Sequence, residues 1–544
     1  MILKNSLNYI NQFFFFIINK TRFFYLNSNI YNKKISKTND NNLEYKPSPN
    51  LLDALIKYKK KKNKIEDYIL SSIWESKNIS KSDYKKLHSF FWLSTLDLKS
   101  SKLSVQSVIL NWINKNKNYD AKSWEVDVLS KRIIAWISYS KISYENSDKE
   151  YKILFNSLIK KQVNHLINEI ERSKSIDNKM ISCSAIILAG LSFQEKQKYL
   201  DFGLGLLKNI IKSSFDSNLF PKSRNVRQLN FYLKYFILIR EWLRESQNEI
   251  PSYIDEVIYH LGQAYSLIWQ GIKKNILFNG NVEFNFDEFD EYIKRLGYKF
   301  KNHNFEIGGF VVLKNKKISL VMDCGPSPEK NFSDEYQCGA LSFEILLSNK
   351  KLICNSGYFQ NYEHKLNLIS KSSANHSTLI VDNRSSCKLI KQRNQKSIVD
   401  QGLKILNKEV IFEKDFWSIN STHDGYLKEY GILHDRKIEF YPNKFKFVGK
   451  DQLINKKNFK SSNFEIRFHL DPEAKVMKTQ DKNSIFIQID QEGWKFSTEE
   501  HNMSVETGLY FGRKNSFLEN QNIFISGMTQ KENQIIKWEL TKIS

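Results

Sequence analysis

The spacing of hydrophobic residues changes its period once along the chain, near residue 297. From about Asp83 to Trp269 the apolar residues recur every three or four positions, which is typical of amphipathic helices. After about Gly297 hydrophobic and polar residues alternate, which is typical of half-buried strands. The pattern therefore predicts a helical half followed by a β half.

Two of the predicted helices are apolar almost all round, whereas others carry one apolar face. The continuous stretches are Met180–Phe193 and Leu229–Leu243, and helices without a polar face are buried on several sides. The one-faced type is clearest in Pro251–Gln270, where the apolar stripe consists of Ile254, Val257, Ile258, Leu261, Tyr265 and Ile268. Buried helices that alternate with half-buried ones suit a double ring, in which an outer layer surrounds an inner one.

The β half consists of short predicted strands separated by turns rich in Asn, Asp, Gly and Lys. Many such strands in series favour a sandwich of antiparallel sheets. A segment rich in Asn, Asp and Phe, residues 278–301, is the predicted linker between the halves. The predicted strand regions are Phe305–Asp323, Leu341–Cys354, Lys437–Val448, Phe464–His469, Ser484–Gln488 and Ile523–Ser526.

The composition fits a globular protein with two large domains. The chain has 544 residues, of which 41% are hydrophobic, so it holds enough apolar material for two cores. Its formal net charge of +24 would suit nucleic acid, an anionic membrane or an acidic polysaccharide as a partner. Lys far outnumbers Arg, so compositional drift explains the charge equally well.

Several classes of function lack their motifs. No GxGxxG or GxxxxGKS loop follows a strand and no GxSxG elbow occurs, so nucleotide chemistry and the common hydrolase arrangement have no support. Nucleic-acid binding rests on net charge alone, and we expect no nucleic-acid partner. The five cysteines form no CxxC pair and no metal-like spacing, so we expect buried free thiols and neither a metal nor a cofactor.

The N-terminal region carries a short aromatic and aliphatic run at Phe13–Ile18. This run is much shorter than the roughly 20 apolar residues of a membrane span, and no small-residue cleavage site follows it. The sequence therefore predicts no transmembrane segment and leaves open a peripheral membrane contact through this end. A periplasmic and a cytoplasmic location both stay open.

Three segments of the β half resemble the β-domain of the heparinase II/III family of polysaccharide lyases. They are Gly308–Pro328, Gly339–Phe359 and Asn375–Asn383, the last of which reads NHSTLIVDN. In the helical half, Leu87–Leu98 and Ser123–Ser138 resemble the family's FxWLxDL and WxxxxLxxRIxxW patterns. The resemblance implies an N-terminal (α/α) toroid followed by a C-terminal antiparallel β-sandwich. The domains expected on this basis are an extension over 1–70, a toroid over 71–280, a linker over 281–300 and a sandwich over 301–544.

The family cleaves uronate-containing glycans by β-elimination, which requires a carboxylate neutraliser, a base and an acid. His376 aligns with the family's β-domain histidine and is a catalytic candidate, because histidine titrates near neutral pH. The segment Ser421–Phe440 resembles the family's HDGY…HRR segment. It makes Tyr426 a candidate acid/base and His423 a candidate carboxylate ligand. Thr378 stands where some members carry a second, zinc-binding histidine, so we expect no metal.

The helical half matches the family's site pattern less closely. Asn178 is the candidate carboxylate ligand, although Lys179 follows it where the family often has a histidine. The segment Phe220–Tyr232 resembles an SRNP-type segment of one bacterial branch, and its guanidinium groups, which suit carboxylate or sulfate, are those of Arg224 and Arg227. Val226 occupies the direct register of the family's catalytic tyrosine, so Tyr232 is the candidate in its place.

The resemblance leaves two other functions open. One is a glycan-binding or cell-envelope scaffold in which the lyase chemistry has been eroded, since a fold does not fix a function. The other is a glycoside hydrolase, which needs two carboxylates across a cleft. No motif singles out Asp216, Glu241 or Glu245 for that role. The resemblance therefore favours a lyase-like protein with an acidic polysaccharide as its partner.

Overall fold

The chain forms two compact units, each described here by itself. The helical unit comprises Met1–Ser213 with Lys234–Ile258, and the sheet unit comprises Ser214–Leu233 with Tyr259–Ser544. The computed structural model describes residues 16–37, 42–53, 74, 79–96, 102–193, 197–270, 272, 275–283, 287–302, 304–348, 350–392, 395–457, 459–479, 484–498, 502–513 and 516–543. The first three residues of the apolar run Phe13–Ile18 therefore lie outside the described part of the chain.

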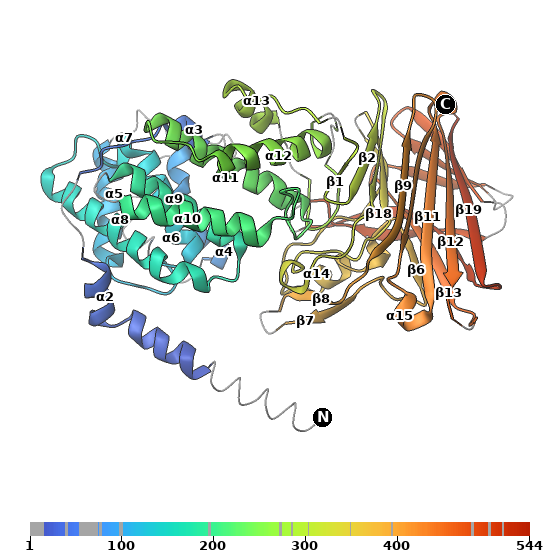
Figure 1. Cartoon of the computed structure of the whole chain (residues 1–544), viewed down its shortest axis with the longest axis horizontal. Helices are drawn as coiled ribbons and strands as arrows, with labels where there is room; N and C mark the ends of the chain where they lie inside the picture. Colours follow the sequence, from blue (N-terminus) through green and yellow to red (C-terminus); the bar gives the residue numbers. More distant parts are fainter. Residues whose placement is uncertain are drawn as a thin grey trace. The chain divides into compact units, whose positions relative to one another are not determined.

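The helical unit is built around a helix that is buried on almost every side. This helix is α9 (Ile176–Ser192), in which every residue from Met180 onward is buried. It packs against α6 (Val126–Ser138), where the hydroxyls of Ser130 and Ser182 lie 2.9 Å apart, and Figure 1 shows α9 within the helical bundle. Further described helices of this unit include α2 (Asn29–Ile35), α3 (Pro49–Asp53), α4 (Lys81–His88), α5 (Lys102–Asn116), α7 (Ser140–Ser143), α8 (Lys149–Glu169) and α10 (Gln197–Ser214).

The boundary between the units falls inside two helices, α11 (Val226–Glu245) and α12 (Ser252–Ile268). The domain limits expected at residues 70, 280 and 300 stay predictions. A helix, α13 (Asp287–Arg295), occupies part of the segment expected to be a linker. In the described residues no helix combines the length and the apolar character needed to cross a membrane.

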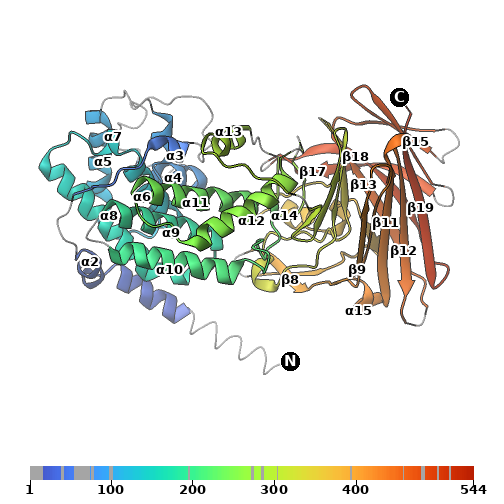
Figure 2. The same ribbon diagram turned by 45° about the horizontal axis from the view of Figure 1, so that its top comes forward.

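The sheet unit contains two large antiparallel sheets that face each other (Figure 2). The first sheet has the order β1-β2-β3-β4-β5-β13-β18-β17, with β6 paired to β13, and the second has the order β14-β15-β16-β19-β12-β11-β10-β9. The first consists of β1 (Glu306–Ile307), β2 (Phe310–Lys314), β3 (Ile318–Asp323), β4 (Phe343–Leu347), β5 (Lys351–Cys354), β6 (Leu379–Val381), β13 (Asn463–Leu470), β17 (Asn502–Tyr510) and β18 (Leu518–Met528). The second consists of β9 (Ile405–Phe412), β10 (Trp417–His423), β11 (Ile432–Tyr441), β12 (Lys446–Asn455), β14 (Lys475–Lys478), β15 (Ser484–Ile489), β16 (Glu492–Ser497) and β19 (Asn533–Lys542).

Smaller elements lie outside the two sheets. Strands β7 (Lys388–Lys391) and β8 (Ser397–Gln401) form a separate hairpin, and α14 (Lys365–Ser370) and α15 (Leu427–Tyr430) are short helices. The predicted order of a helical half followed by an antiparallel β-sandwich is thereby confirmed.

The core between the two sheets is aromatic. The indole of Trp538 stacks on Phe343 at 5.5 Å and on Phe496 at 5.8 Å, and it meets the ring of Phe468 edge-on. These rings come from both sheets, so the contacts join the two layers. Burial of such rings contributes apolar area together with aromatic pair geometry, and both stabilise the sandwich.

Two sequence predictions have clear structural outcomes. The five cysteines are free and buried, as predicted. The region Lys437–Val448 is not one strand, because β11 ends at Tyr441 and β12 begins at Lys446. The turn between them contains Pro442, which lacks a backbone donor, and Phe445, which has a positive φ of 45°. Alternating hydrophobicity continued across this turn and concealed it.

The packing of the core can be tested at Gly449, which is paired with Trp538 across β12 and β19. A Cβ at position 449 would overlap the indole ring. We expect Gly449→Ala to destabilise the sheet unit by about 1–3 kcal/mol, the usual cost of overpacking. The measurement is hydrogen exchange by mass spectrometry in a urea series, because it reports the two units separately.

The matched control is Gly205→Ala in α10, where a Cβ meets no described atom within 4 Å. Alanine is the better helix former, so this variant should leave the sheet unit unchanged and stabilise its helix by up to about 1 kcal/mol. Equal protection of β12 in the wild type and in Gly449→Ala would contradict the packing described above.

Candidate active site

His376 lies three residues before β6, on a segment that the sheet unit holds by its backbone. Its amide donates to the Ser373 carbonyl at 3.0 Å, and its own carbonyl accepts from Thr378 at 2.8 Å. Ser377 donates its amide to Asn355 Oδ1 at 3.0 Å and its hydroxyl to the Cys354 carbonyl at 2.7 Å. These bonds fix the direction in which the His376 side chain leaves the backbone.

The imidazole of His376 is buried, and it packs closely against backbone. The residue is 1% exposed, and a Cβ at Gly339 would lie 2.8 Å from its Cγ. Glycine at position 339 therefore makes room for the ring. Any larger side chain there would push the ring out of its place.

Neither ring nitrogen of His376 has a hydrogen-bond partner among the described residues. The amide nitrogen of Asn355, whose oxygen holds the next residue of the segment, is also without one in this part of the chain. Buried polar groups in folded proteins are nearly always paired, so an imidazole with two unpaired nitrogens requires an explanation. Burial lowers the pKa of His376 to about 3, and His469 adds to the effect, so the ring is neutral at pH 7.

A second buried histidine, His469 on β13, lies beside this segment. Its Nε2 is 3.0 Å from the Ala374 carbonyl, which only accepts, so Nε2 carries the proton and Nδ1 accepts from the Ser356 hydroxyl at 3.2 Å. Burial and, to a lesser extent, the charge of Arg467 lower its pKa to about 3. His469 also lines a pocket of about 480 Å³ together with Asn375.

His423 and His434 form a buried chain with Asp451. The Gly425 amide donates to His423 Nδ1 at 3.0 Å, so His423 carries its proton on Nε2 and donates it to His434 Nδ1 at 3.2 Å. His434 then donates from Nε2 to Asp451 Oδ1 at 2.7 Å. Burial lowers the pKa of both histidines, and Arg436 adds to the effect, so both rings are neutral.

Arg436 connects this chain to the segment that bears His376. It forms two hydrogen bonds to the Asp451 carboxylate, from Nε at 2.7 Å and from Nη2 at 3.1 Å. Its Nη1 donates to the Ser377 carbonyl at 2.7 Å and to the Leu341 carbonyl at 2.9 Å. Burial alone would raise the pKa of Asp451, but Arg436 and the bond from His434 hold it at about 2. The ionised carboxylate thus positions the residue that follows His376.

The other predicted β-domain residues are engaged within the protein. Tyr426 is buried, and its hydroxyl lies 3.1 Å from the Leu379 carbonyl and 3.3 Å from the Arg384 carbonyl. Both ring nitrogens of His423 are used in the chain above. Tyr426 and His423 therefore lie behind the His376 segment, and their bonds oppose a direct contact with substrate.

Each nitrogen of the Arg224 guanidinium also donates to a protein acceptor. Its Nε donates to the Gly308 carbonyl at 2.9 Å, its Nη1 donates to the Pro326 carbonyl at 2.9 Å, and its Nη2 forms an ion pair with Asp323. The side chain is buried, so this guanidinium joins the start of α11 to the turns beside β2 and β3. These bonds oppose its predicted role as a carboxylate ligand.

The neighbours of Arg224 start a helix. Asn225 caps α11 by accepting from the amides of Arg227 at 2.9 Å and Gln228 at 3.2 Å. Arg227 remains partly exposed, with 27% of its side chain accessible, and donates to Glu335 at 2.8 Å. Of the two predicted arginines, Arg227 has the more exposed side chain.

The two remaining predicted residues lie on different units. Tyr232 is buried in α11, with its ring 5.0 Å from that of Phe215. Asn178 is partly buried in the first turn of α9 in the helical unit, where its amide bonds to the N-cap hydroxyl of Ser175 at 3.3 Å. The sheet unit thus gathers His376, His423 and Tyr426, and Asn178 belongs to the helical unit.

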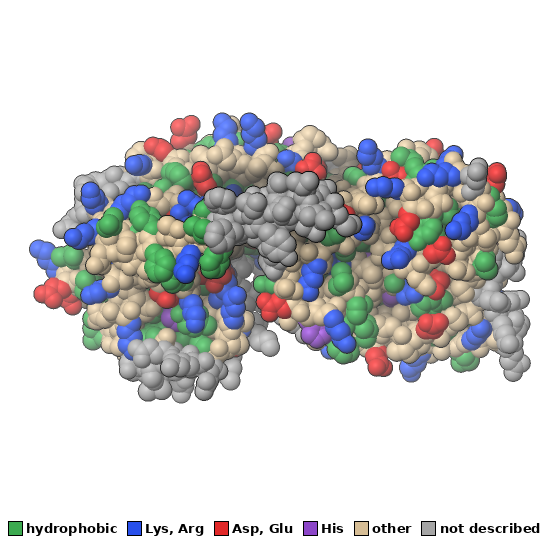
Figure 3. Space-filling model, turned by 90° about the horizontal axis from the view of Figure 1, so that it is seen from below, with side chains coloured by type: hydrophobic (Ala, Val, Ile, Leu, Met, Phe, Trp, Pro, Cys, Tyr) green, Lys and Arg blue, Asp and Glu red, His purple; other side chains and the backbone are tan. Residues whose placement is uncertain are grey.

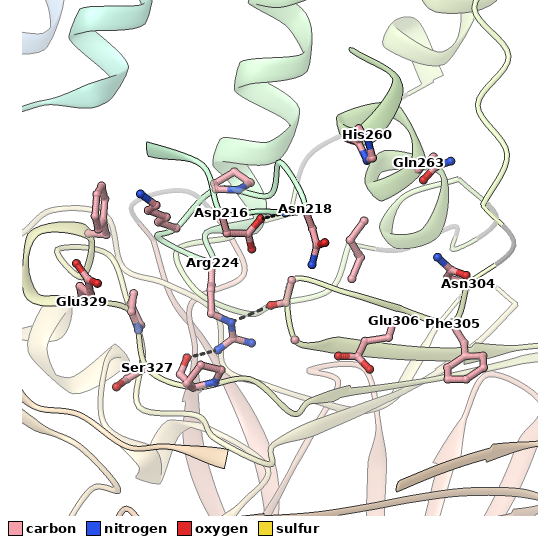
Figure 4. A pocket seen from close by; sticks show the side chains of 18 residues that line it. Asp216, Asn218, Arg224, His260, Gln263, Asn304, Phe305, Glu306, Ser327 and Glu329 are labelled. Atoms are coloured by element: carbon pink, nitrogen blue, oxygen red, sulfur yellow. Dashed lines mark hydrogen bonds between the residues drawn. The ribbon is translucent and has the colours of Figure 1, made fainter. Parts of the chain in front are cut away.

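A larger pocket of about 760 Å³ opens in the sheet unit beside Arg224. In Figure 4, Asp216, Asn218, Glu306 and His260 surround an open space. Its acidic and basic groups are mixed, so it gives no preference for an anionic ligand. In the described residues no group of three or more His, Cys, Asp or Glu side chains has the arrangement of a metal site.

Residues 299–539 match the family model of the heparinase II/III-like C-terminal domain. This part of the chain is therefore similar to the heparinase II/III-like C-terminal domain. Over 95% of its length and 89% of the other chain it superposes on heparinase III, with a TM-score of 0.70 and 14% identity. A heparan sulfate lyase of Pedobacter heparinus aligns over 88% of this chain and 79% of that one, with a TM-score of 0.67 and 14% identity. At such identities the likeness shows the fold alone, and it confirms the predicted fold class.

One curated relative is the FtsZ-localized protein C of Caulobacter vibrioides. It is 22% identical over 249 residues, which are 43% of this chain and 42% of that protein. The alignment therefore spans less than half of either protein. The family resemblance stated from the sequence motifs is confirmed by the family model and by the heparinase III fold.

Because His376 is buried and neutral, we expect the stability of the protein to fall as the pH is lowered. Its pKa is about 3 when folded and about 6.5 when unfolded. The unfolded chain therefore binds the proton first as the pH falls. The stabilising contribution is complete above pH 6.5 and is lost by about 1.4 kcal/mol per pH unit down to about pH 3. We expect His376→Gln to flatten this slope in urea unfolding at pH 7.5, 6.5, 5.5 and 4.5 (a series of roughly one-unit steps).

The control is His260→Gln, a substitution of a partly buried histidine on α12. Other buried histidines contribute equally to both variants, so the comparison isolates position 376. A slope in His376→Gln that equals the wild-type slope would show that folding does not lower the pKa of His376.

The hydrogen bonds around Asp451 predict that loss of a buried charge pair lowers the free energy of unfolding much more than loss of an exposed pair. Asp451→Asn removes the counter-charge of the buried Arg436 and should destabilise the sheet unit by about 3–5 kcal/mol. The double variant Arg436→Met/Asp451→Leu leaves no unpaired charge and should recover part of this loss. The control on β11 is Glu439→Gln, which breaks the half-exposed pair with Lys437 and should cost less than about 1 kcal/mol. Equal losses in Asp451→Asn and Glu439→Gln, measured by urea unfolding, would contradict the network.

Proposed function

We propose that the protein binds an acidic, uronate-containing glycan and cleaves it by β-elimination. The observation that carries the proposal is His376, a neutral buried imidazole whose two nitrogens have no partner in the described residues. The unpartnered amide of Asn355 beside its segment adds a donor. An amide donor and a neutral imidazole can together receive a carboxylate and the proton next to it.

The lowered pKa of His376 has a consequence for this chemistry. An imidazole with a pKa of about 3 is a weak base in the empty site. A substrate carboxylate beside the ring would favour the imidazolium and raise its pKa toward neutrality. In this proposal the carboxylate of an acidic substrate therefore makes His376 a stronger base, and a neutral glycan would not.

The other groups of the proposed reaction come from the sequence motifs. Tyr232 is the proposed acid/base and Asn178 the proposed carboxylate ligand. Arg227, partly exposed, is the proposed cation for a second acidic group. Arg224, His423 and Tyr426 contribute by holding backbone in place, because their polar atoms bond within the protein.

A second candidate is a glycan-binding or cell-envelope scaffold without lyase activity. The internal hydrogen bonds of Arg224, His423 and Tyr426 favour it, because three groups expected to contact substrate are occupied by the fold. The relative named for its localisation to FtsZ also fits such a role, although it aligns over only 42% of its length. Both candidates predict binding of an acidic polysaccharide, and only the first predicts its cleavage.

The test incubates the full chain with a panel of uronate polysaccharides and follows the ultraviolet absorbance of the unsaturated product. The lyase proposal predicts cleavage of at least one member and a loss of about 100-fold or more in His376→Ala, the usual contribution of a general base. Lys437→Gln, which removes an exposed charge on β11, should keep full activity. Binding without cleavage in the wild type, unchanged in His376→Ala, would favour the scaffold. Cleavage that persists in His376→Ala would refute the assigned base.

A further inference from the structure

The helix at residues 16–26 exposes large apolar side chains on most of its surface. Phe16 and Phe24 are each 62% exposed, and neighbours of the same type are Ile17, Ile18, Phe23 and Tyr25. A helix that is apolar on most sides is normally found in a core or at a membrane. The described residues of the helical unit do not cover these side chains.

The segment is attached to the helical unit at one end. Arg22 forms an ion pair with Glu169 at the end of α8, and Leu26 is buried. Just beyond, the Tyr31 hydroxyl lies 2.7 Å from His165 Nδ1 within the unit. Figure 1 shows the helix in dark blue, standing off the rest of the bundle. The exposed apolar side chains therefore lie on a helix that is attached to the helical unit.

The charge of this region is of one sign. Residues 1–37 contain six Lys or Arg residues and no Asp or Glu. Lys20 Nζ lies 5.8 Å from the centre of the Phe16 ring, so cationic and aromatic groups share the same surface. Figure 3 shows hydrophobic and basic side chains side by side on this face of the helical unit.

The length and the charge of residues 16–26 indicate which kind of partner they bind. The eleven described helical residues span about 16 Å, roughly half the thickness of a bilayer core, a length that suits a helix lying in the interface. Positive charge opposes the approach of a second copy and favours an anionic lipid surface, at about 1 kcal/mol per basic residue. Aromatic side chains are well suited to the headgroup level.

We propose that residues 16–26 lie in the interface of an anionic lipid bilayer and hold the protein peripherally at that surface. This inference goes beyond the proposed glycan chemistry and does not depend on it. It assigns a partner to apolar side chains that the described residues of the helical unit leave exposed.

The experiment is sedimentation of the full chain with vesicles of phosphatidylcholine, with and without phosphatidylglycerol. We expect binding to the anionic vesicles that is at least about tenfold tighter than to the neutral ones and that weakens as salt is raised. Phe23→Ser/Phe24→Ser should reduce binding by about tenfold or more, because two aromatic rings leave the interface. The control pair Ile153→Ser/Leu154→Ser, adjacent residues of α8 that are each 44% exposed, should bind like the wild type.

Three outcomes would overturn the proposal. The first is the absence of binding to anionic vesicles, and the second is binding that Phe23→Ser/Phe24→Ser retains. The third is self-association without lipid that the same double variant abolishes, which would assign the surface to a second copy of the chain. Sedimentation velocity over a range of protein concentrations detects that case.

Discussion

The arrangement of the sheet unit depends on one buried carboxylate, Asp451. It accepts from Arg436, from His434 and from the Trp538 indole at 3.1 Å, and these donors come from two strands that flank its own. A buried charge without partners costs several kcal/mol, so the register of β11, β12 and β19 must bring all three donors to it. A slip of one residue would turn Asp451 to the other face of its sheet and leave Arg436 unpaired.

The protons of the hydrogen-bond chain that ends at Asp451 can be placed in only one way. A backbone amide fixes the tautomer of His423, which fixes that of His434, which delivers its proton to the carboxylate. A second proton on either ring would face Arg436 and would remove an acceptor that the chain needs. The family-like HDGY…HRR segment therefore serves as a rigid support, and Arg436 carries that rigidity to the carbonyl next to His376.

The sequence predicted what depends on periodicity and on local motif. The change from helices to strands, the buried cysteines and the position of His376 just before a strand all follow from nearby residues. The pairing of Arg224 does not, because its partner Asp323 lies 99 positions away. The pairing of Arg436 with Asp451 requires the register of β11 on β12, which the sequence pattern had merged across Pro442. Burial, which separates a ligand-binding arginine from a structural one, appears only when distant segments pack.

The contrast among the polar groups of the sheet unit is the strongest argument about its function. Arg224, Arg436, His434 and Asp451 are buried and bonded to the protein, as folding requires. His376 is equally buried, yet both of its ring nitrogens lack partners in the described residues. Each unpaired buried group costs about 1–3 kcal/mol. The fold satisfies these four groups and leaves His376 without a described partner on a segment that it holds rigidly, and this contrast supports the proposed ligand at that imidazole.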